Sequence, residues 1–145
     1  MSANNPTTML AFDWGTQKIG VAVGQTLTQT ATPLKELPAK DGIPQWDMIE
    51  KLVAEWQPDA FVVGLPLNMD DTETEHTPRA RKFANRLNAR FGLPWFGVDE
   101  RLSSFDARKT IAAKARETGV APKKGRLVDS VAAVLILETW FSTHC

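Results

Sequence analysis

Cysteine and histidine are scarce in this chain of 145 residues, and their scarcity excludes several kinds of chemistry. The only cysteine is Cys145, the last residue, so an internal disulfide is impossible. The two histidines, His76 and His144, stand alone, and no Cys/His spacing typical of a zinc site occurs. A Ser-His-Asp or Cys-His arrangement has little support either, because His76 lies in an acidic loop and His144 near the C-terminus.

Long apolar runs, a secretory pattern and an excess of charge of one sign are also missing. No apolar stretch approaches the length of about 18 residues that a membrane helix needs, so we expect a cytoplasmic protein without membrane contact. The formal net charge is zero, which argues against a general polyanion-coating protein. Residues 101–126 nevertheless hold eight Lys or Arg against two acids, which indicates either a phosphate-facing surface or ordinary solvated helix faces.

The order of the predicted elements is that of an α/β protein. Two strands at 9–14 and 18–24 form a hairpin, and Pro33 makes a third strand at 28–35 an edge strand. Strands and helices then alternate, which predicts a mixed sheet of about five strands with helices on both faces. We expect a disordered polar tail over 1–8 and a single domain over 9–145. The remaining predictions are helices at 45–56, 78–91, about 103–117 and 126–141, strands at 60–65 and 93–98, and a polar loop at 66–77.

Carboxylates follow the strands of this predicted sheet. Asp13 ends the first strand, and Asp99 and Glu100 follow the last one, where functional groups of open α/β sheets collect. Asp129 lies in the final helix, where Ala132 and Ala133 permit close packing; alternatively it only complements the helix dipole. Such acids repel one another unless cations neutralise them, and Mg²⁺ prefers oxygen ligands. Two such ions about 4 Å apart can promote phosphodiester hydrolysis.

Two other phosphate chemistries fit less well. The glycines at 15, 20 and 24 do not have the spacing of a Walker or Rossmann phosphate loop. An ATP-using enzyme of the actin and sugar-kinase type also carries a DxG hairpin. It needs a second domain, however, which 145 residues do not contain.

Five ordered segments, FDWGTQKIGVAVG, VVGLPLNMD, ARKFANRL, DERLSS and LVDSVAAVLILE, resemble the YqgF or RuvX family. These proteins are Holliday-junction-resolvase-like and have a ribonuclease H-like fold, and the resemblance spans residues 9–141. It implies a nuclease in 5′-end maturation of pre-16S ribosomal RNA, with a resolvase role for some members. It also implies that Asp13, Glu100 and Asp129 are the catalytic and metal-binding residues, with Mg²⁺ or Mn²⁺ as the cofactor. Asp99 is the runner-up for the middle position, because alternation along a strand does not say which of two neighbours faces the metal.

The expected partner is nucleic acid, most of all pre-rRNA, with branched DNA and ribosomal precursor particles as further options. Several polar residues are candidates for contacting the substrate backbone without reading its sequence. A ribosome-assembly factor that binds RNA without cutting it is the alternative from another functional class. The chain is expected to be a monomer or a homodimer. The candidate substrate-binding residues are Lys18, Asn68, Arg101, Lys123, Lys124 and Arg126.

Overall fold

The computed structural model describes residues 7–67, 70, 72–99 and 126–144, and it leaves the side chains of 126–130 undescribed. The helix expected over about 103–117 and residues 1–6 of the expected tail lie outside the described residues. Thr7 is inside them: its amide donates a 3.0 Å hydrogen bond to Thr26 Oγ1, and the first strand begins at the next residue.

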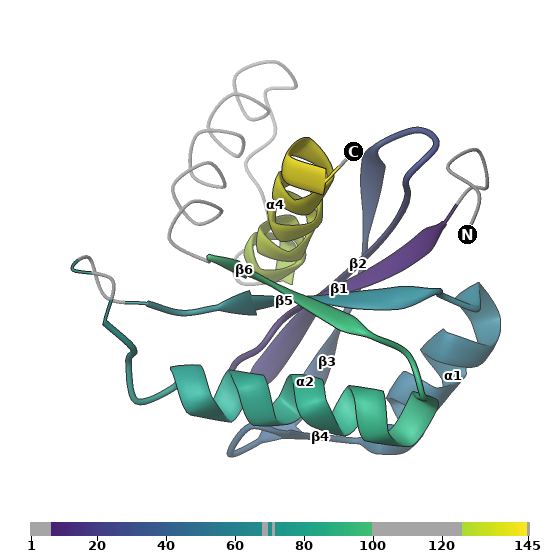
Figure 1. Cartoon of the computed structure of the whole chain (residues 1–145). Coiled ribbons are helices and arrows are strands. Elements are labelled where there is room, and N and C mark those ends of the chain that lie inside the picture. The colour runs from purple at the N-terminus through teal and green to yellow at the C-terminus, as the bar shows by residue number, and fades with distance from the viewer. Residues whose placement is uncertain (1–6, 68–69, 71, 100–125, 145) are drawn as a thin grey trace, which may run out of the picture.

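A mixed six-stranded sheet forms the centre of the molecule, in the order β4-β3-β2-β1-β5-β6 (Figure 1). The hairpin of β1 and β2 is antiparallel, as predicted, whereas β1, β5 and β6 run parallel. The α/β class with a hairpin followed by parallel strands is therefore confirmed. The strands are β1 (Thr8–Asp13), β2 (Lys18–Gln25), β3 (Thr30–Lys40), β4 (Ile43–Pro44), β5 (Ala60–Leu65) and β6 (Trp95–Asp99).

The sheet has six strands rather than five because the chain reverses tightly after β3. Asp41 and Gly42 both have positive φ values, 50° and 80°, as in the hairpin turns that Asp-Gly pairs favour. The segment KDGIPQ thereby returns Ile43 and Pro44 to pair with the end of β3, where no strand was predicted. Strand β3 is also longer than the expected 28–35. Pro33 fits at an edge, since β4 reaches only Ala39 and Lys40 in the described sheet.

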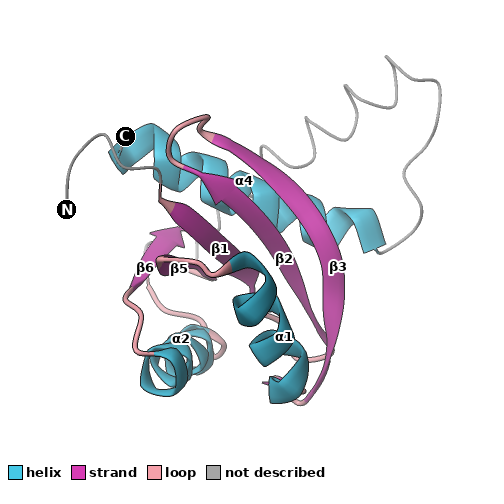
Figure 2. Ribbon diagram, turned by 90° about the vertical axis from the view of Figure 1, so that its right-hand side faces the viewer, coloured by secondary structure: helices cyan, strands magenta, loops and turns pink. Residues whose placement is uncertain are grey.

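Helices cover both faces of the sheet (Figure 2). Helices α1 (Trp46–Trp56) and α2 (Thr77–Phe91) lie on one face, and α4 (Arg126–His144) lies on the other. Gln57 and Gly92 end α1 and α2 in the left-handed conformation, with φ values of 47° and 68°. In the described part of the chain, no helix combines the length and the apolarity that a membrane span would need.

The core has two layers because side chains alternate across the strands. Leu10, Phe12, Phe61 and Val63 point toward α1 and α2 and pack in one cluster with residues such as Phe83. The intervening residues form the second cluster with α4. Its members include Met9, Ala11, Ala22, Val62, Val98, Ala133, Ile136, Leu137 and Phe141.

Candidate active-site edge

The carboxyl ends of β1, β5 and β6 meet at one edge of the sheet, as the sequence predicted. Phe12 lies beside Val63, and Leu65 lies beside Asp99 in the parallel pairs that join these strands. Asp13, the last residue of β1, is paired across the hairpin with Gly20. Three segments that are far apart in the sequence therefore end within a few strand spacings of one another, each spacing being about 4.8 Å.

Asp13 belongs to the face of the sheet that α4 covers. Met9 and Ala11 are buried against α4, and Asp13 follows them in the same alternation. Its carboxyl group is only partly exposed, and the Oδ1 atom is fully shielded from solvent. A carboxylate in such a place is costly unless positive charge or hydrogen bonds compensate it.

Asp99 belongs to the opposite face. In β6, Trp95 packs with the cluster under α1 and α2, whereas Val98 packs with the α4 cluster. Phe96 also lies on the α4 side, with its ring centroid 5.2 Å from that of Trp140. Odd-numbered residues of β6 therefore face α2, and Asp99 is directed away from the face that carries Asp13.

Helix α4 approaches the sheet closely and runs toward the end of β1. Gly24, paired with Met9 at the start of β1, shows this approach: a Cβ there would lie 3.0 Å from Leu137 and 3.1 Å from Phe141. Since the C-terminal half of α4 covers the start of β1, its N-terminal turns extend toward Asp13. Asp129 is in these turns, although its side chain is not among those described.

Among the predicted substrate-binding residues, Lys18 is the one whose side chain the structure describes. Lys18 is partly exposed at the start of β2, opposite Pro38 of β3. Within the described residues no group of three or more potential metal ligands occurs. Arg126 is the first residue of α4, and its side chain is undescribed. The predicted residues that lie outside the description are Asn68, Glu100, Arg101, Lys123 and Lys124.

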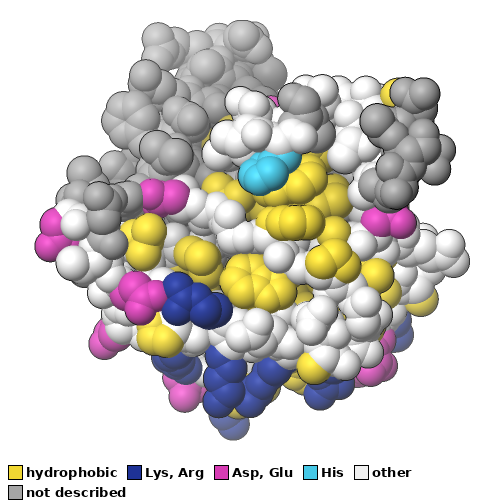
Figure 3. All heavy atoms as spheres, in the orientation of Figure 1, with side chains coloured by type: hydrophobic (Ala, Val, Ile, Leu, Met, Phe, Trp, Pro, Cys, Tyr) yellow, Lys and Arg dark blue, Asp and Glu magenta, His cyan; other side chains and the backbone are white. Residues whose placement is uncertain are grey.

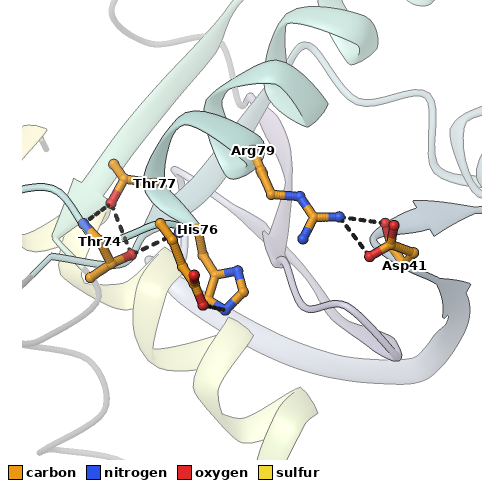
Figure 4. A network of polar contacts seen from close by, with 6 residues as sticks. Asp41, Thr74, His76, Thr77 and Arg79 are labelled. Carbon is orange, nitrogen blue, oxygen red and sulfur yellow. Dashed lines mark hydrogen bonds and ion pairs between the residues drawn. The ribbon is translucent and has the colours of Figure 1, made fainter.

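The loop after β5 is fixed to the start of α2 by threonine hydroxyls (Figure 4). The fully buried Thr77 donates its hydroxyl to the Pro66 carbonyl and accepts a 2.9 Å hydrogen bond from the Thr74 amide. The His76 amide donates to Thr74 Oγ1 at 3.1 Å. Both ends of the loop are thus held at the carboxyl end of β5, beside the edge that carries Asp13.

Sequence reasoning missed the side chains near this edge on the face of the sheet that α1 and α2 cover. Trp14 follows Asp13 directly and, by alternation, is buried in the α1 and α2 layer. The guanidinium carbon of Arg79 lies 5.2 Å from the centre of the Trp14 ring. The available signal was the spacing of Arg79, Lys82 and Arg86, which places three cations on one face of α2.

Solved structures with a similar fold include two Holliday junction resolvases. RuvC from Thermus thermophilus, in complex with a Holliday junction substrate, aligns with a TM-score of 0.56 and 15% identity, over 94% of this chain and 97% of RuvC. The yeast mitochondrial resolvase Ydc2 aligns with a TM-score of 0.52 and 9% identity, over 92% of this chain and 77% of Ydc2. The chain therefore has the ribonuclease H-like fold that its sequence predicted.

Comparison of sequences gives the family. The RuvX family model, described as Holliday junction resolvase, matches residues 7–143. A protein of Shewanella oneidensis is 58% identical over 142 residues, which is 97% of both chains. One of Haemophilus ducreyi is 52% identical over 138 residues, 95% of this chain and 98% of the relative. Both are named "Putative pre-16S rRNA nuclease". This chain belongs to the RuvX family, as its motifs predicted.

Proposed function

We propose that this chain is a divalent-metal-dependent nuclease that hydrolyses phosphodiester bonds of RNA in the cytoplasm, with the 5′ end of pre-16S ribosomal RNA as its substrate. The names of its relatives support the substrate. The observation on which the chemistry depends is the position of Asp13, at the carboxyl end of a central strand and on the face covered by α4.

Asp13, Glu100 and Asp129 are the proposed metal-binding and catalytic carboxylates. Alternation along β6 disfavours Asp99, because this residue belongs to the face opposite Asp13. Residue 129 precedes the buried Ala133 by four positions and Ile136 by seven, a spacing typical of one helix face. The spacing supports a partnership between Asp129 and Asp13.

The donor set suits Mg²⁺ or Mn²⁺, because both ions favour carboxylate oxygens. When bound, such an ion polarises the phosphodiester group and lowers the pKa of an attacking water. Asp13 contributes a fixed anchor, since its Oδ1 atom is enclosed and its strand is hydrogen-bonded on both sides. The apolar residues behind it keep bulk water from the back of the site.

Basic and amide side chains around this edge are proposed to hold the phosphate backbone. They would position the RNA, while the carboxylates act at the scissile bond. Ribosomal precursor particles are the natural setting for such a substrate, and a monomer or a homodimer is compatible with it. The proposed backbone contacts are Lys18, Asn68, Arg101, Lys123, Lys124 and Arg126.

Replacing Asp13 tests the chemistry. We expect Asp13→Asn to abolish cleavage of an RNA that carries the pre-16S leader, in Mg²⁺ and in Mn²⁺, because the amide cannot replace an anionic ligand. Asp99→Asn is the matched control and should cut at the parent rate. The measurement is single-turnover cleavage followed on a sequencing gel. Parent-like cutting by Asp13→Asn would show that the proposed role is wrong.

Cleavage of branched DNA is the second candidate, because the matching family model is described as a Holliday junction resolvase. A four-way DNA junction and the leader RNA, offered separately to the same purified protein, distinguish the two. Preferred cleavage of the junction would favour the resolvase. Tight RNA binding without cleavage in either metal would favour the non-cleaving assembly factor.

A further inference from the structure

A groove lies between α2 and the Asp41–Pro44 turn, on the face of the sheet opposite α4. Its cavity has a volume of about 210 Å³. One wall is the turn, the opposite wall is formed by Arg79, Lys82 and Arg86 of α2, and Trp14 and Trp46 contribute aromatic surface. We call this feature the α2 groove.

The charge of α2 is entirely positive. The helix carries five Lys or Arg and no acidic residue over TPRARKFANRLNARF. Arg79 bonds to Asp41, Arg81 lies 2.5 Å from Glu73, and Arg90 lies 4.0 Å from Glu50. Lys82 and Arg86, both exposed in the groove wall, have no ion pair or hydrogen bond with any described residue. Figure 3 shows Lys and Arg side chains gathered at the lower edge of the view, where α2 runs in Figure 1.

The wall formed by the Asp41–Pro44 turn is held in place by hydrogen bonds from Arg79 and Trp14. Arg79 reaches across from α2 and donates to the Asp41 carbonyl at 2.7 Å and to its carboxylate at 3.0 Å (Figure 4). The Trp14 Nε1–H donates to the Gly42 carbonyl at 3.0 Å. A Cβ at Gly42 would lie 2.3 Å from the Trp14 ring, so only glycine fits this contact. The groove is thus formed before any ligand arrives, which lowers the entropic cost of binding.

The α2 groove adjoins the sheet edge that carries Asp13, because Trp14, the next residue, lines the groove. Asp13 and Trp14 are consecutive, and their side chains belong to opposite faces of the sheet. A polymer that crosses the carboxyl edge of the sheet can therefore meet Asp13 on one side and the cations of α2 on the other.

We infer that the α2 groove binds the phosphate backbone of single-stranded RNA that flanks the scissile bond; this inference rests on the proposed function. Phosphate fits better than a base, because aromatic faces in the groove already have partners. Arg79 covers Trp14, while Phe83 and Arg90 pack against Trp46. The available groups are the Lys82 ammonium and the Arg86 guanidinium, which bind phosphate without regard to sequence. At about 210 Å³, the cavity can enclose part of a single strand, whereas a duplex could touch only its rim.

The test removes the two available charges. We expect Lys82→Ala/Arg86→Ala to bind single-stranded RNA more weakly in EDTA, where no cleavage occurs. Its plot of log K against log salt should be shallower by about 1.4, at roughly 0.7 for each lost phosphate contact on a single strand. Fluorescence anisotropy over a salt series measures both. Lys35→Ala/Lys51→Ala is the matched control: both lysines are exposed, neither lines the α2 groove, and the slope should stay at the parent value.

Cleavage kinetics separate this inference from the proposed function. The groove variant should show a raised KM for long RNA and an unchanged kcat, because the carboxylates are intact. An unchanged salt slope, an equal loss in the control pair, or a loss seen only with branched DNA would each overturn the groove assignment. In those cases RNA cleavage by the parent protein would leave the proposed function standing. If the parent protein does not cut RNA but the groove variant still loses affinity for it, the proposed function is wrong and the groove assignment stands.

Discussion

At the scale of single residues, Thr77 shows how a buried hydroxyl fixes the loop beside the candidate site. Its side chain is fully buried, donates to the Pro66 carbonyl and accepts from the Thr74 amide. Removing the hydroxyl leaves both backbone groups without this partner in a place where water has little access.

We therefore expect Thr77→Val to lower the free energy of unfolding by about 1–3 kcal/mol, since valine keeps the shape but makes no hydrogen bond. Urea denaturation measures the loss. Thr77→Ser keeps the hydroxyl and should recover most of the difference. Equal stability of the valine and threonine proteins would contradict this account of the loop.

Asp13 and Asp99 illustrate how a shift of one residue along a strand changes the face of the sheet to which a side chain belongs. Both are carboxylates at the carboxyl ends of parallel strands, yet the first belongs to the α4 face and the second to the α2 face. Period-two alternation predicts opposite faces for two neighbouring residues such as Asp99 and Glu100, but leaves open which of them shares a face with Asp13. The packing of Trp95 and Val98 against different helices resolves this for Asp99.

At the scale of elements, α4 joins the core to the candidate site. Ala133 is completely buried in the cluster between α4 and the sheet, and its small side chain permits close packing there. The same helix contains Asp129 one turn earlier. Any change that pushes α4 away from the sheet should therefore affect both stability and cleavage.

Ala133→Leu tests this coupling. Adding three carbons to a packed interface should destabilise the protein by about 1–3 kcal/mol and also reduce metal-dependent cleavage. Ser142→Leu, exposed near the end of the same helix, should leave both properties close to the parent. Thermal melts and single-turnover cleavage are the measurements. An unstable Ala133→Leu protein with full activity would show that α4 does not position the site.

Most elements could be predicted because their signals are local. The all-apolar run AFVVGL forms β5 over Ala60–Leu65, the range expected. Helix α2 begins at Thr77, one residue before the expected start at Pro78, and ends at Phe91, as expected. Strand β4 was missed because two residues, Ile43 and Pro44, carry no periodic pattern. They become a strand only by pairing with Ala39 and Lys40.

At the scale of the whole molecule, zero net charge conceals a division of charge between segments. Helix α2 is purely basic, whereas the loop before it contains Asp70, Asp71, Glu73 and Glu75. The acidic loop and the Asp13 edge oppose a polyanion, while α2 attracts one. An RNA strand bound along α2 would approach the acidic edge more readily if cations neutralised the carboxylates.

The metal should therefore stabilise the folded protein as well as enable cleavage. At about a hundredfold excess over its Kd, a cation that binds only the native state adds about 2.7 kcal/mol to the free energy of unfolding. We expect Mg²⁺ or Mn²⁺ to raise the Tm of the parent.

Asp13→Asn should remove this rise while leaving the metal-free protein as stable as the parent or more so, because carboxylate repulsion is relieved. Calorimetry with and without metal measures both effects. Asp47→Asn, exposed on α1, is the control and should retain the rise. An identical rise in Asp13→Asn would place the cation elsewhere.

The α2 groove could not be found from the sequence, since Asp41 and Arg79 lie 38 residues apart and meet only when the β3–β4 turn packs against α2. The spacing of Arg79, Lys82 and Arg86 was compatible with one basic helix face. It did not predict that a tryptophan next to Asp13 would form part of the same cavity.

The sequence by itself determined the α/β class, the hairpin, the parallel strands and the placement of acids at their carboxyl ends. These properties follow from local patterns of apolar, turn-forming and capping residues. Only the tertiary structure decided that Asp13 and Asp99 belong to opposite faces of the sheet, and that cations of α2 adjoin the edge where Asp13 lies. Both depend on which helix covers which face, and that choice is made by packing between distant segments, which no local pattern specifies.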